Sequence, residues 1–264
     1  MQGDSALGRA VALVRDLRAR CPWDAAQTPQ TLRPYLVEET LELDQAIRHD
    51  DPGAVREELG DLLLNFAFQI VIAEERGQFG AEQVTRGLEE KMWRRHPHLF
   101  GLGDMPASWE HGKRGSREPG AGSRSALAGL PPTLPPLLMA YRLQERAAGV
   151  GFDWPDAAGP MEKVKEETAE LEREVASERP APGSRLPARV AQELGDLLFA
   201  VVNLARKLGV EPGQALERAN DKFRARFSTV ERLASERGLE LGRATLAELD
   251  AIWDEVKRAE GPPR

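Results

Sequence analysis

Apolar residues recur along most of the chain at the spacing of three or four residues that one face of an α-helix requires. Ala, Leu, Glu and Arg dominate these stretches, runs of β-branched residues are scarce, and Pro and Gly interrupt them. The pattern predicts an all-α chain. The expected helices are 5–20, 32–49, 52–76 and 81–95 in the first half, and 137–148, 159–177, 187–208, 211–237 and 246–258 in the second.

Residues at the ends of these segments favour the same boundaries. Ser5 suits the N-cap of the first helix and Pro22 stops that helix. Pro52 suits the first turn of the third helix, and Gly77 follows its end. Four amphipathic helices with short connections are typical of a helical bundle, so each half is expected to be four-helix-bundle-like.

One acidic pattern occurs in both halves of the chain. The first copy reads Glu38-Glu39-Thr40-Leu41-Glu42 and then Glu58-Leu59-Gly60-Asp61, and the second reads Glu166-Glu167-Thr168-Ala169-Glu170 and then Glu193-Leu194-Gly195-Asp196. A basic pair and a tryptophan follow each copy: Lys91, Arg95 and Trp109 in the first, and Lys222, Arg226 and Trp253 in the second. Order, residue type and approximate spacing all recur, which indicates a tandem duplication.

The duplication divides the chain into two expected domains, residues 1–118 and 136–264, joined by a Gly/Pro-rich linker at 119–135. A second Pro-rich stretch, 178–187, separates the two acidic helices of the second half. It is longer than its counterpart at 50–52, so the second copy is expected to carry a loop insertion.

Composition excludes several classes of function. The 264 residues carry a net charge of -7, so no basic field is available to hold a nucleic-acid polymer, although a small anion held through a metal is compatible. The single cysteine, Cys21, rules out an intramolecular disulfide, and all four histidines lie in the first half, so chemistry shared by both copies cannot use imidazole. The N-terminus does not resemble a signal peptide and the apolar stretch 62–73 is too short to span a bilayer. We expect a cytoplasmic protein without a membrane partner.

The repeated carboxylates are spaced to act together. Residues three apart share a helix face, which pairs Glu39 with Glu42, Glu58 with Asp61, Glu167 with Glu170, and Glu193 with Asp196. The segments after Asp61 and Asp196 are apolar on nearly every face, so these helices are expected to lie in a core or an interface. Carboxylates beside such a helix need a compensating cation, and an all-oxygen ligand set selects Mg²⁺ first and Mn²⁺ second.

The basic pair has two interpretations. Lys222 and Arg226 lie one helical turn apart and suit a clamp on phosphate oxygens, and Arg226 can bond a phosphate through two N–H groups. The alternative is a solvated face or ion pairs with nearby acidic residues. Trp253 suits stacking on a nucleobase or, equally, ordinary packing of the last helix.

Together with these motifs, other short segments resemble the MazG family of two-domain nucleoside triphosphate pyrophosphohydrolases. The segments are Cys21-Pro22-Trp23-Asp24, Glu57-Glu58-Leu59-Gly60-Asp61-Leu62-Leu63, Arg94-Arg95-His96-Pro97-His98, Gly151-Phe152-Asp153-Trp154 and Asn203-Leu204-Ala205-Arg206. The resemblance implies an all-α fold related to the dimeric dUTPases, a homodimer, and Mg²⁺-dependent hydrolysis of nucleoside triphosphates to monophosphate and pyrophosphate. A broad specificity that cleanses the nucleotide pool is the expected role.

The resemblance also implies roles for particular residues. In the second copy the expected metal ligands are Glu167, Glu170, Glu193 and Asp196, and the expected nucleotide contacts are Lys163, Arg189, Lys222, Arg226 and Trp253. Glu166 is a candidate to orient or deprotonate the attacking water. The first copy keeps Glu39, Glu42, Glu58 and Asp61 as a second candidate metal site, but the second copy is expected to be the main catalytic one.

Three other functions compete with this interpretation. A ferritin-like di-iron bundle requires Glu-x-x-His motifs, and the second half contains no histidine. A module that senses metal and nucleotide without turnover fits nearly the same residues. Within the enzymes, a specialist for dUTP, dCTP or phosphoribosyl-ATP is the alternative to a broad specificity.

Overall fold

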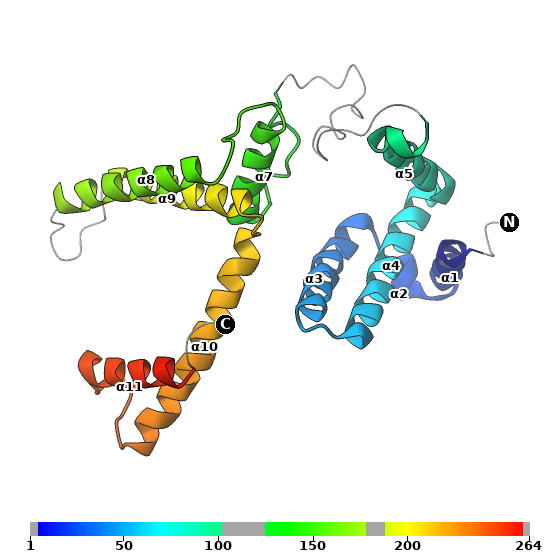
Figure 1. Cartoon of the computed structure of the whole chain (residues 1–264). Helices are drawn as coiled ribbons and strands as arrows, with labels where there is room; N and C mark the ends of the chain where they lie inside the picture. The colour runs from blue at the N-terminus through cyan, green and yellow to red at the C-terminus, as the bar shows by residue number, and fades with distance from the viewer. Residues whose placement is uncertain (1–4, 102–124, 178–187, 261–264) are drawn as a thin grey trace. The chain divides into compact units, whose positions relative to one another are not determined.

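The computed structural model describes residues 5–101, 125–177 and 188–260. These residues form α-helices, one short 3-10 helix and turns, with no strand among them, which confirms the all-α prediction. They belong to two compact units, one within Met1–Arg117 and one within Glu118–Arg264, each described by itself below (Figure 1). No helix in the described ranges is both long and apolar enough to cross a membrane.

The helices of the first unit are α1 (Ala6–Arg20), α2 (Pro22–Ala25), α3 (Pro29–Arg48), α4 (Pro52–Glu75), α5 (Ala81–Arg95) and the 3-10 helix η1 (Pro97–Leu99). Their ends follow from local chemistry. The Ser5 hydroxyl caps α1 by accepting from the Gly8 amide, and the Asp51 carboxylate caps α4 by accepting from the amides of Gly53 and Ala54. Gly77 follows the end of α4 and adopts the left-handed backbone conformation, with φ +64°.

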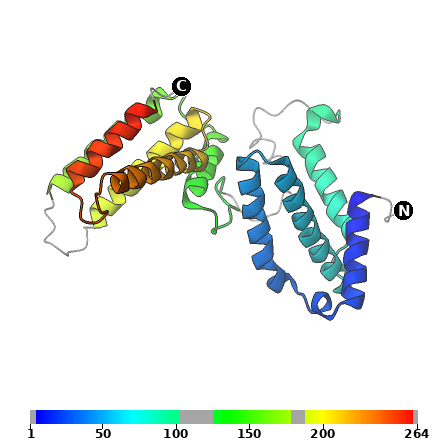
Figure 2. The ribbon, with the colours of Figure 1, turned by 90° about the horizontal axis from the view of Figure 1, so that it is seen from below.

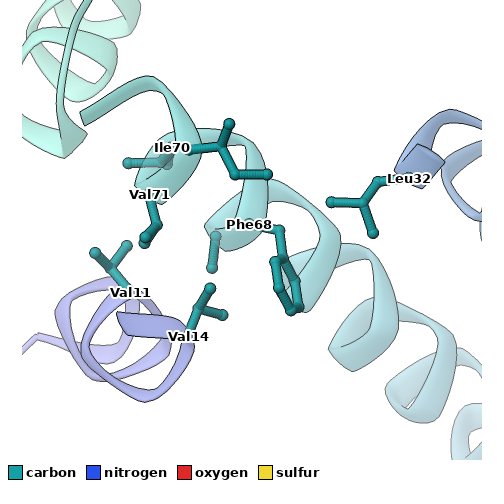
Figure 3. Packing of buried hydrophobic residues seen from close by; sticks show 8 residues of the cluster. Val11, Val14, Leu32, Phe68, Ile70 and Val71 are labelled. Carbon is teal, nitrogen blue, oxygen red and sulfur yellow. The ribbon is translucent and has the colours of Figure 1, made fainter. Parts of the chain in front are cut away.

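Helix α4 is the centre of the first unit because it packs on α1 along one side and on α3 along another (Figures 1 and 2). Figure 3 shows Val11 of α1 beside Val71 of α4 and Val14 beside Phe68, with Ile70 on another side of α4. Leu32 of α3 and Ala67 and Ile72 of α4 complete this core. The contacts fix the antiparallel α3–α4 hairpin, which carries the first acidic copy.

The helices of the second unit are α7 (Pro136–Ala148), α8 (Ala158–Ser177), α9 (Ala188–Lys207), α10 (Pro212–Glu236) and α11 (Leu246–Ala259). Helices α8 and α9 pack along each other and carry the second acidic copy, and α7 packs on α9. Helix α11 packs on α10 through a small separate core made of Val230, Ala234, Ile252 and Val256. Helix α10, which carries the predicted phosphate clamp, packs mainly on α11 and also contacts α7 and α9.

The apolar segments after the acidic pairs are only partly covered within one chain. In α4, Leu62 and Phe68 are buried, whereas Phe66 is 50% exposed. In α9, Val202 is buried but Leu198 is 51% exposed. One face of α4 and one face of α9 are buried within their own units. Another face of each helix exposes large apolar side chains to solvent.

Several predicted boundaries differ from those observed. Helix α3 begins at Pro29, three residues earlier than predicted, because Thr28 and Thr31 form a reciprocal capping box and Pro29 is tolerated in the first turn. Pro22 ends the first helix as predicted, but it also opens the short helix α2, which the pattern did not indicate. Trp109, the first part of the linker at 119–124 and the predicted inserted loop at 178–187 lie outside the described residues.

The small α10–α11 core generates a stability prediction. Ile252 is 1% exposed, so Ile252→Ala removes buried methylene groups and is expected to lower the free energy of unfolding by about 2–5 kcal/mol. Leu246→Ala is the matched control, because Leu246 is 83% exposed and its truncation should change stability by no more than about 0.5 kcal/mol. Chemical denaturation followed by circular dichroism measures both. Equal effects of the two substitutions would contradict the docking of α11 on α10.

Candidate functional site

Three carboxylates of the second unit meet between α8 and α9. Glu167 and Glu170 share one face of α8 because they are three residues apart, and Glu193 reaches them from the first turns of α9. One carboxylate oxygen from each lies within 4.8 Å of the other two. Glu167 is 5% exposed, so this group includes a buried charge.

The electrostatics of this group are unfavourable without a cation. Burial, and then the negative charges of Glu170, Asp196 and Glu167, raise the pKa of Glu193 above its ordinary value. An all-oxygen set of clustered carboxylates with one buried member matches the ligand preference of Mg²⁺ and Mn²⁺. The residues present therefore fit a hard divalent ion.

One lysine lies against the acidic group. Lys163 Nζ is 2.7 Å from Glu167 Oε1 and 3.0 Å from Glu166 Oε1. Hydrogen bonds to these two carboxylates raise the pKa of Lys163 well above its usual range, so the ammonium stays charged. A single ammonium does not neutralise the surrounding carboxylates, which leaves the site acidic.

The first unit has a similar acidic group in the α3–α4 hairpin. Carboxylate oxygens of Glu39, Glu58 and Asp61 lie within 4.8 Å of one another. Burial, followed by the charges of the neighbouring carboxylates, raises the pKa values of Glu39 and Glu58. The two copies differ one turn before the first glutamate, where Tyr35 stands in the position that Lys163 has in the second copy.

Other predicted ligands lie at the edge of these groups. Glu42 and Asp196 are exposed and belong to neither three-residue group, although their charges act on Glu58 and Glu193 respectively. Arg189 is exposed in the first turn of α9. Glu166 is exposed and is bound to Lys163.

The predicted phosphate clamp lies on α10, and neither Lys222 nor Arg226 lines the pocket that contains Glu167 and Asp196. Arg226 pairs with Glu260, with 2.6 Å between Nη2 and Oε2, and its guanidinium lies 5.8 Å from the Trp253 ring centroid. Trp253 also contacts Phe223 and packs partly buried against the α10–α11 core. In this structure Trp253 therefore packs against its own helices, which is the second of the two roles considered for it. In the first unit, Lys91 is exposed on α5.

The sequence did not indicate a role for the Gly151–Trp154 segment. In the structure this segment lies beside the acidic group of the second unit. Asp153 accepts hydrogen bonds from Arg206 and from Lys207 Nζ at 3.3 Å, and Lys207 Nζ also donates to the Trp154 carbonyl at 2.6 Å. Burial opposes ionisation of Asp153, but the bonds from Arg206 and Lys207 hold its pKa below the ordinary value. The Trp154 indole lies against Gly159, where an added Cβ would overlap the ring.

A pocket of about 210 Å³ connects this segment with the carboxylates. Its wall is formed by Trp154 and Pro160, by Lys163 and Glu167 of α8, and by Asp196, Phe199, Ala200 and Asn203 of α9. Two sequence motifs, Gly151–Trp154 and Asn203–Arg206, could have indicated this pocket. Their proximity is visible only in the structure, where Asp153 and Arg206 form an ion pair.

The fold and the site define an all-α protein with two copies of a carboxylate-bearing helical hairpin. The chain belongs to the MazG family, since residues 27–100 and 159–230 both match the MazG nucleotide pyrophosphohydrolase domain.

Individual relatives cover nearly the whole chain. It is 42% identical over 253 residues to the nucleoside triphosphate pyrophosphohydrolase/pyrophosphatase MazG of Thermotoga maritima, with 94% of each chain covered. It is 41% identical over 253 residues to the nucleoside triphosphate pyrophosphohydrolase of Escherichia coli K12, again with 94% of each covered. A Bacillus subtilis protein, YabN, is 43% identical over 257 residues, which are 94% of this chain and 51% of that protein.

The anchoring of the Gly151–Trp154 segment generates a prediction. Asp153→Asn removes the negative charge that holds Arg206 and Lys207, so amide hydrogen exchange in 151–157 is expected to become about ten-fold faster or more. Asp221→Asn is the matched control, because Asp221 pairs with Arg224 at 3.5 Å on an exposed helix face. Mass spectrometry of the exchanged peptides distinguishes the two. Unchanged exchange in Asp153→Asn would show that other contacts hold the segment.

Proposed function

We propose that the protein hydrolyses nucleoside triphosphates to nucleoside monophosphates and pyrophosphate with Mg²⁺, mainly at the α8–α9 hairpin. The observation that carries the proposal is the acidic group of Glu167, Glu170 and Glu193, in which Glu167 is buried and the single ammonium of Lys163 leaves an excess of negative charge. The Thermotoga maritima and Escherichia coli relatives, which are named nucleoside triphosphate pyrophosphohydrolases, support the reaction. Broad specificity, action on cytoplasmic nucleotides, and Mn²⁺ as a substitute ion belong to the same proposal.

Each side chain of the site has a different proposed role in the reaction. Glu167, Glu170, Glu193 and Asp196 would hold the ion, which when bound neutralises phosphate charge and acidifies a bound water. Lys163 stays protonated and presents its ammonium to phosphate oxygens beside Glu167. Glu166, exposed and bonded to Lys163, accepts a proton from the attacking water or orients it.

The second copy is the better candidate for turnover because it has Lys163 where the first copy has Tyr35. A cation at this position stabilises charge on the transferring group, which a phenol does not do. The first copy has a comparable acidic group without this lysine. The first copy therefore suits a site that senses metal and nucleotide without turnover. Sensing is the alternative function that we propose for that half of the chain.

We also propose that the protein is a homodimer. Leu198 and Val201 of α9, and Phe66 and Leu59 of α4, expose between 44% and 52% of their surface, so both helices present large apolar side chains to solvent. A second copy packed on them would cover the faces. It would also offer a route for Lys222 and Arg226 of α10 to approach an α8–α9 acidic group from the neighbouring copy.

Paired inactivation tests which copy is catalytic. The Glu193→Gln, Asp196→Asn double variant is expected to lower pyrophosphate release by about a hundred-fold or more, because the ion loses charged ligands while the helices keep their packing. The Glu58→Gln, Asp61→Asn double variant is the matched control and should keep most of the activity. Release of pyrophosphate from nucleoside triphosphates with Mg²⁺, with Mn²⁺ and with chelator measures all three proteins. The assignment is wrong if the first-unit variant is the inactive one, and the absence of any turnover in the unaltered protein would favour sensing.

The homodimer has its own test. Analytical ultracentrifugation at micromolar protein is expected to give twice the chain mass of 29.1 kDa. Leu198→Lys places a charge on the exposed apolar face of α9 and should shift the protein toward monomer. Leu246→Lys, at an exposed position on α11, should not. A monomeric unaltered protein would overturn the proposal.

A further inference from the structure

Helices α10 and α11 pack through stripes of residues that lie four apart. The stripes are Arg226, Val230 and Ala234 on α10, and Ile252, Val256 and Glu260 on α11. The four apolar members are buried and form the small core between the two helices. The remaining two, Arg226 and Glu260, form an ion pair beside that core. The packing that buries the core therefore also brings this ion pair together.

The Glu260 carboxylate holds one edge of the Arg226 guanidinium. The Nε atom of Arg226 donates to Oε1 at 3.1 Å and to Oε2 at 3.0 Å, and Nη2 donates to Oε2 at 2.6 Å. These bonds all lie on the Nε side of the planar group. Among the described residues, Nη1 of Arg226 makes no hydrogen bond. The N–H groups of Nη1 and the second N–H of Nη2 are therefore left for a ligand.

A second contact restrains the plane of the same guanidinium. Its Cζ atom lies over the Trp253 ring, 5.8 Å from the ring centroid, which is within the distance of a cation–π interaction. Trp253 in turn contacts Phe223, with the ring centroids 5.4 Å apart. The Arg226 side chain is only 20% exposed, so it is restrained on one edge and on one face. An arginine held in this way loses little conformational freedom when it binds phosphate.

Glu260 carries its negative charge close to both residues of the predicted clamp. The hydrogen bond from Arg226 lowers the pKa of Glu260, burial opposes this, and the charges of Arg226 and Lys222 lower it further. Glu260 is therefore ionised at neutral pH. These three side chains together keep an excess of positive charge, so they can still attract a phosphate group while Glu260 is charged.

We propose that Glu260 is a positioning residue for the reaction, which holds the Nε edge of Arg226 and thereby directs the Nη1 end of the guanidinium at a phosphate group of the substrate. The inference rests on the proposed function and on the phosphate contact predicted for Arg226. Glu260 itself does not touch the substrate. It acts on the transition state, because a guanidinium that is already oriented stabilises developing charge without first having to be ordered.

The opposite role for Glu260 is competition with phosphate for Arg226. A carboxylate that competes would bond the outer end of the guanidinium, whereas the observed bonds lie on its Nε edge. The geometry therefore favours positioning. The two roles also predict opposite effects of removing the carboxylate: competition predicts tighter phosphate binding, and positioning predicts a slower reaction.

Single-turnover release of pyrophosphate with Mg²⁺ tests the proposal. Arg226→Ala is expected to be about a hundred-fold slower, because the guanidinium is lost. Glu260→Ala is expected to be about ten-fold slower, because the guanidinium remains but is no longer fixed. The Arg226→Ala, Glu260→Ala double variant should stay within about two-fold of Arg226→Ala, because Glu260 acts only through Arg226.

Glu260→Gln separates the position of the acceptor from its charge. Oε2 alone accepts from both Nε and Nη2, so a single amide oxygen can take its place. This variant should therefore keep the rate within about three-fold of the unaltered protein.

Glu255→Ala is the matched control, because Glu255 of α11 forms a separate ion pair with Arg237, the C-cap residue of α10, at 2.7 Å. It should keep the rate within about two-fold. Circular dichroism and chemical denaturation check that the variants are folded.

Calorimetry with Mg²⁺ and inorganic tripolyphosphate adds a measurement of phosphate binding without turnover. Neither Glu260 variant is expected to bind this probe more tightly than the unaltered protein. If both bind it about five-fold more tightly and neither loses rate, Glu260 is a competitor and the positioning role is wrong.

Three further outcomes overturn the positioning role while leaving the proposed reaction in place. They are a Glu260→Ala variant as fast as Glu255→Ala, a Glu260→Gln variant as slow as Glu260→Ala, and a double variant clearly slower than Arg226→Ala. An unaltered protein that releases no pyrophosphate would instead defeat the proposed function, and the role of Glu260 with it.

Discussion

The packing of two helices against each other forces like charges together, and the rest of the site depends on this constraint. Packing of α8 on α9 places Glu167, Glu170 and Glu193 with oxygens within 4.8 Å of one another, and packing of α3 on α4 does the same for Glu39, Glu58 and Asp61. Burial, followed by repulsion among these carboxylates, raises the pKa of Glu193, Glu39 and Glu58. A divalent cation bound among these oxygens would relieve the repulsion.

The two copies of the hairpin share this constraint and differ in what surrounds it. In the second unit, Lys163 binds Glu166 and Glu167, and Asp153 ties the Gly151–Trp154 segment to α9 beside the carboxylates. The first unit has Tyr35 in place of the lysine. Duplication therefore preserved the residues that bring the acidic groups together, while the position of Lys163 diverged to tyrosine in the first copy. This difference is the physical basis for assigning catalysis mainly to the second unit.

Packing within each unit also explains which predicted residues remain apart. Helix α10 carries Lys222 and Arg226, but its close partners are α11 and α7, and Arg226 is neutralised by Glu260. At the same time α4 and α9 each expose an apolar face next to their acidic pair. Both observations are consistent with a site that one chain does not complete, which links the proposed homodimer to the proposed reaction.

The sequence by itself determined the long helices and which carboxylates share a helix face, because both depend on local spacing. Residues three apart share a helix face wherever the helix lies, so Glu167 with Glu170 and Glu58 with Asp61 were predictable. Helix starts that depend on side-chain caps were less predictable, as α3 shows with its capping box at Thr28. Only the tertiary structure decided the partners across long separations: Asp153 with Arg206, Gln144 Nε2 with the Phe199 carbonyl, and Arg226 with Glu260. Such contacts depend on how helices distant in sequence pack together, and no local pattern along the chain encodes that geometry.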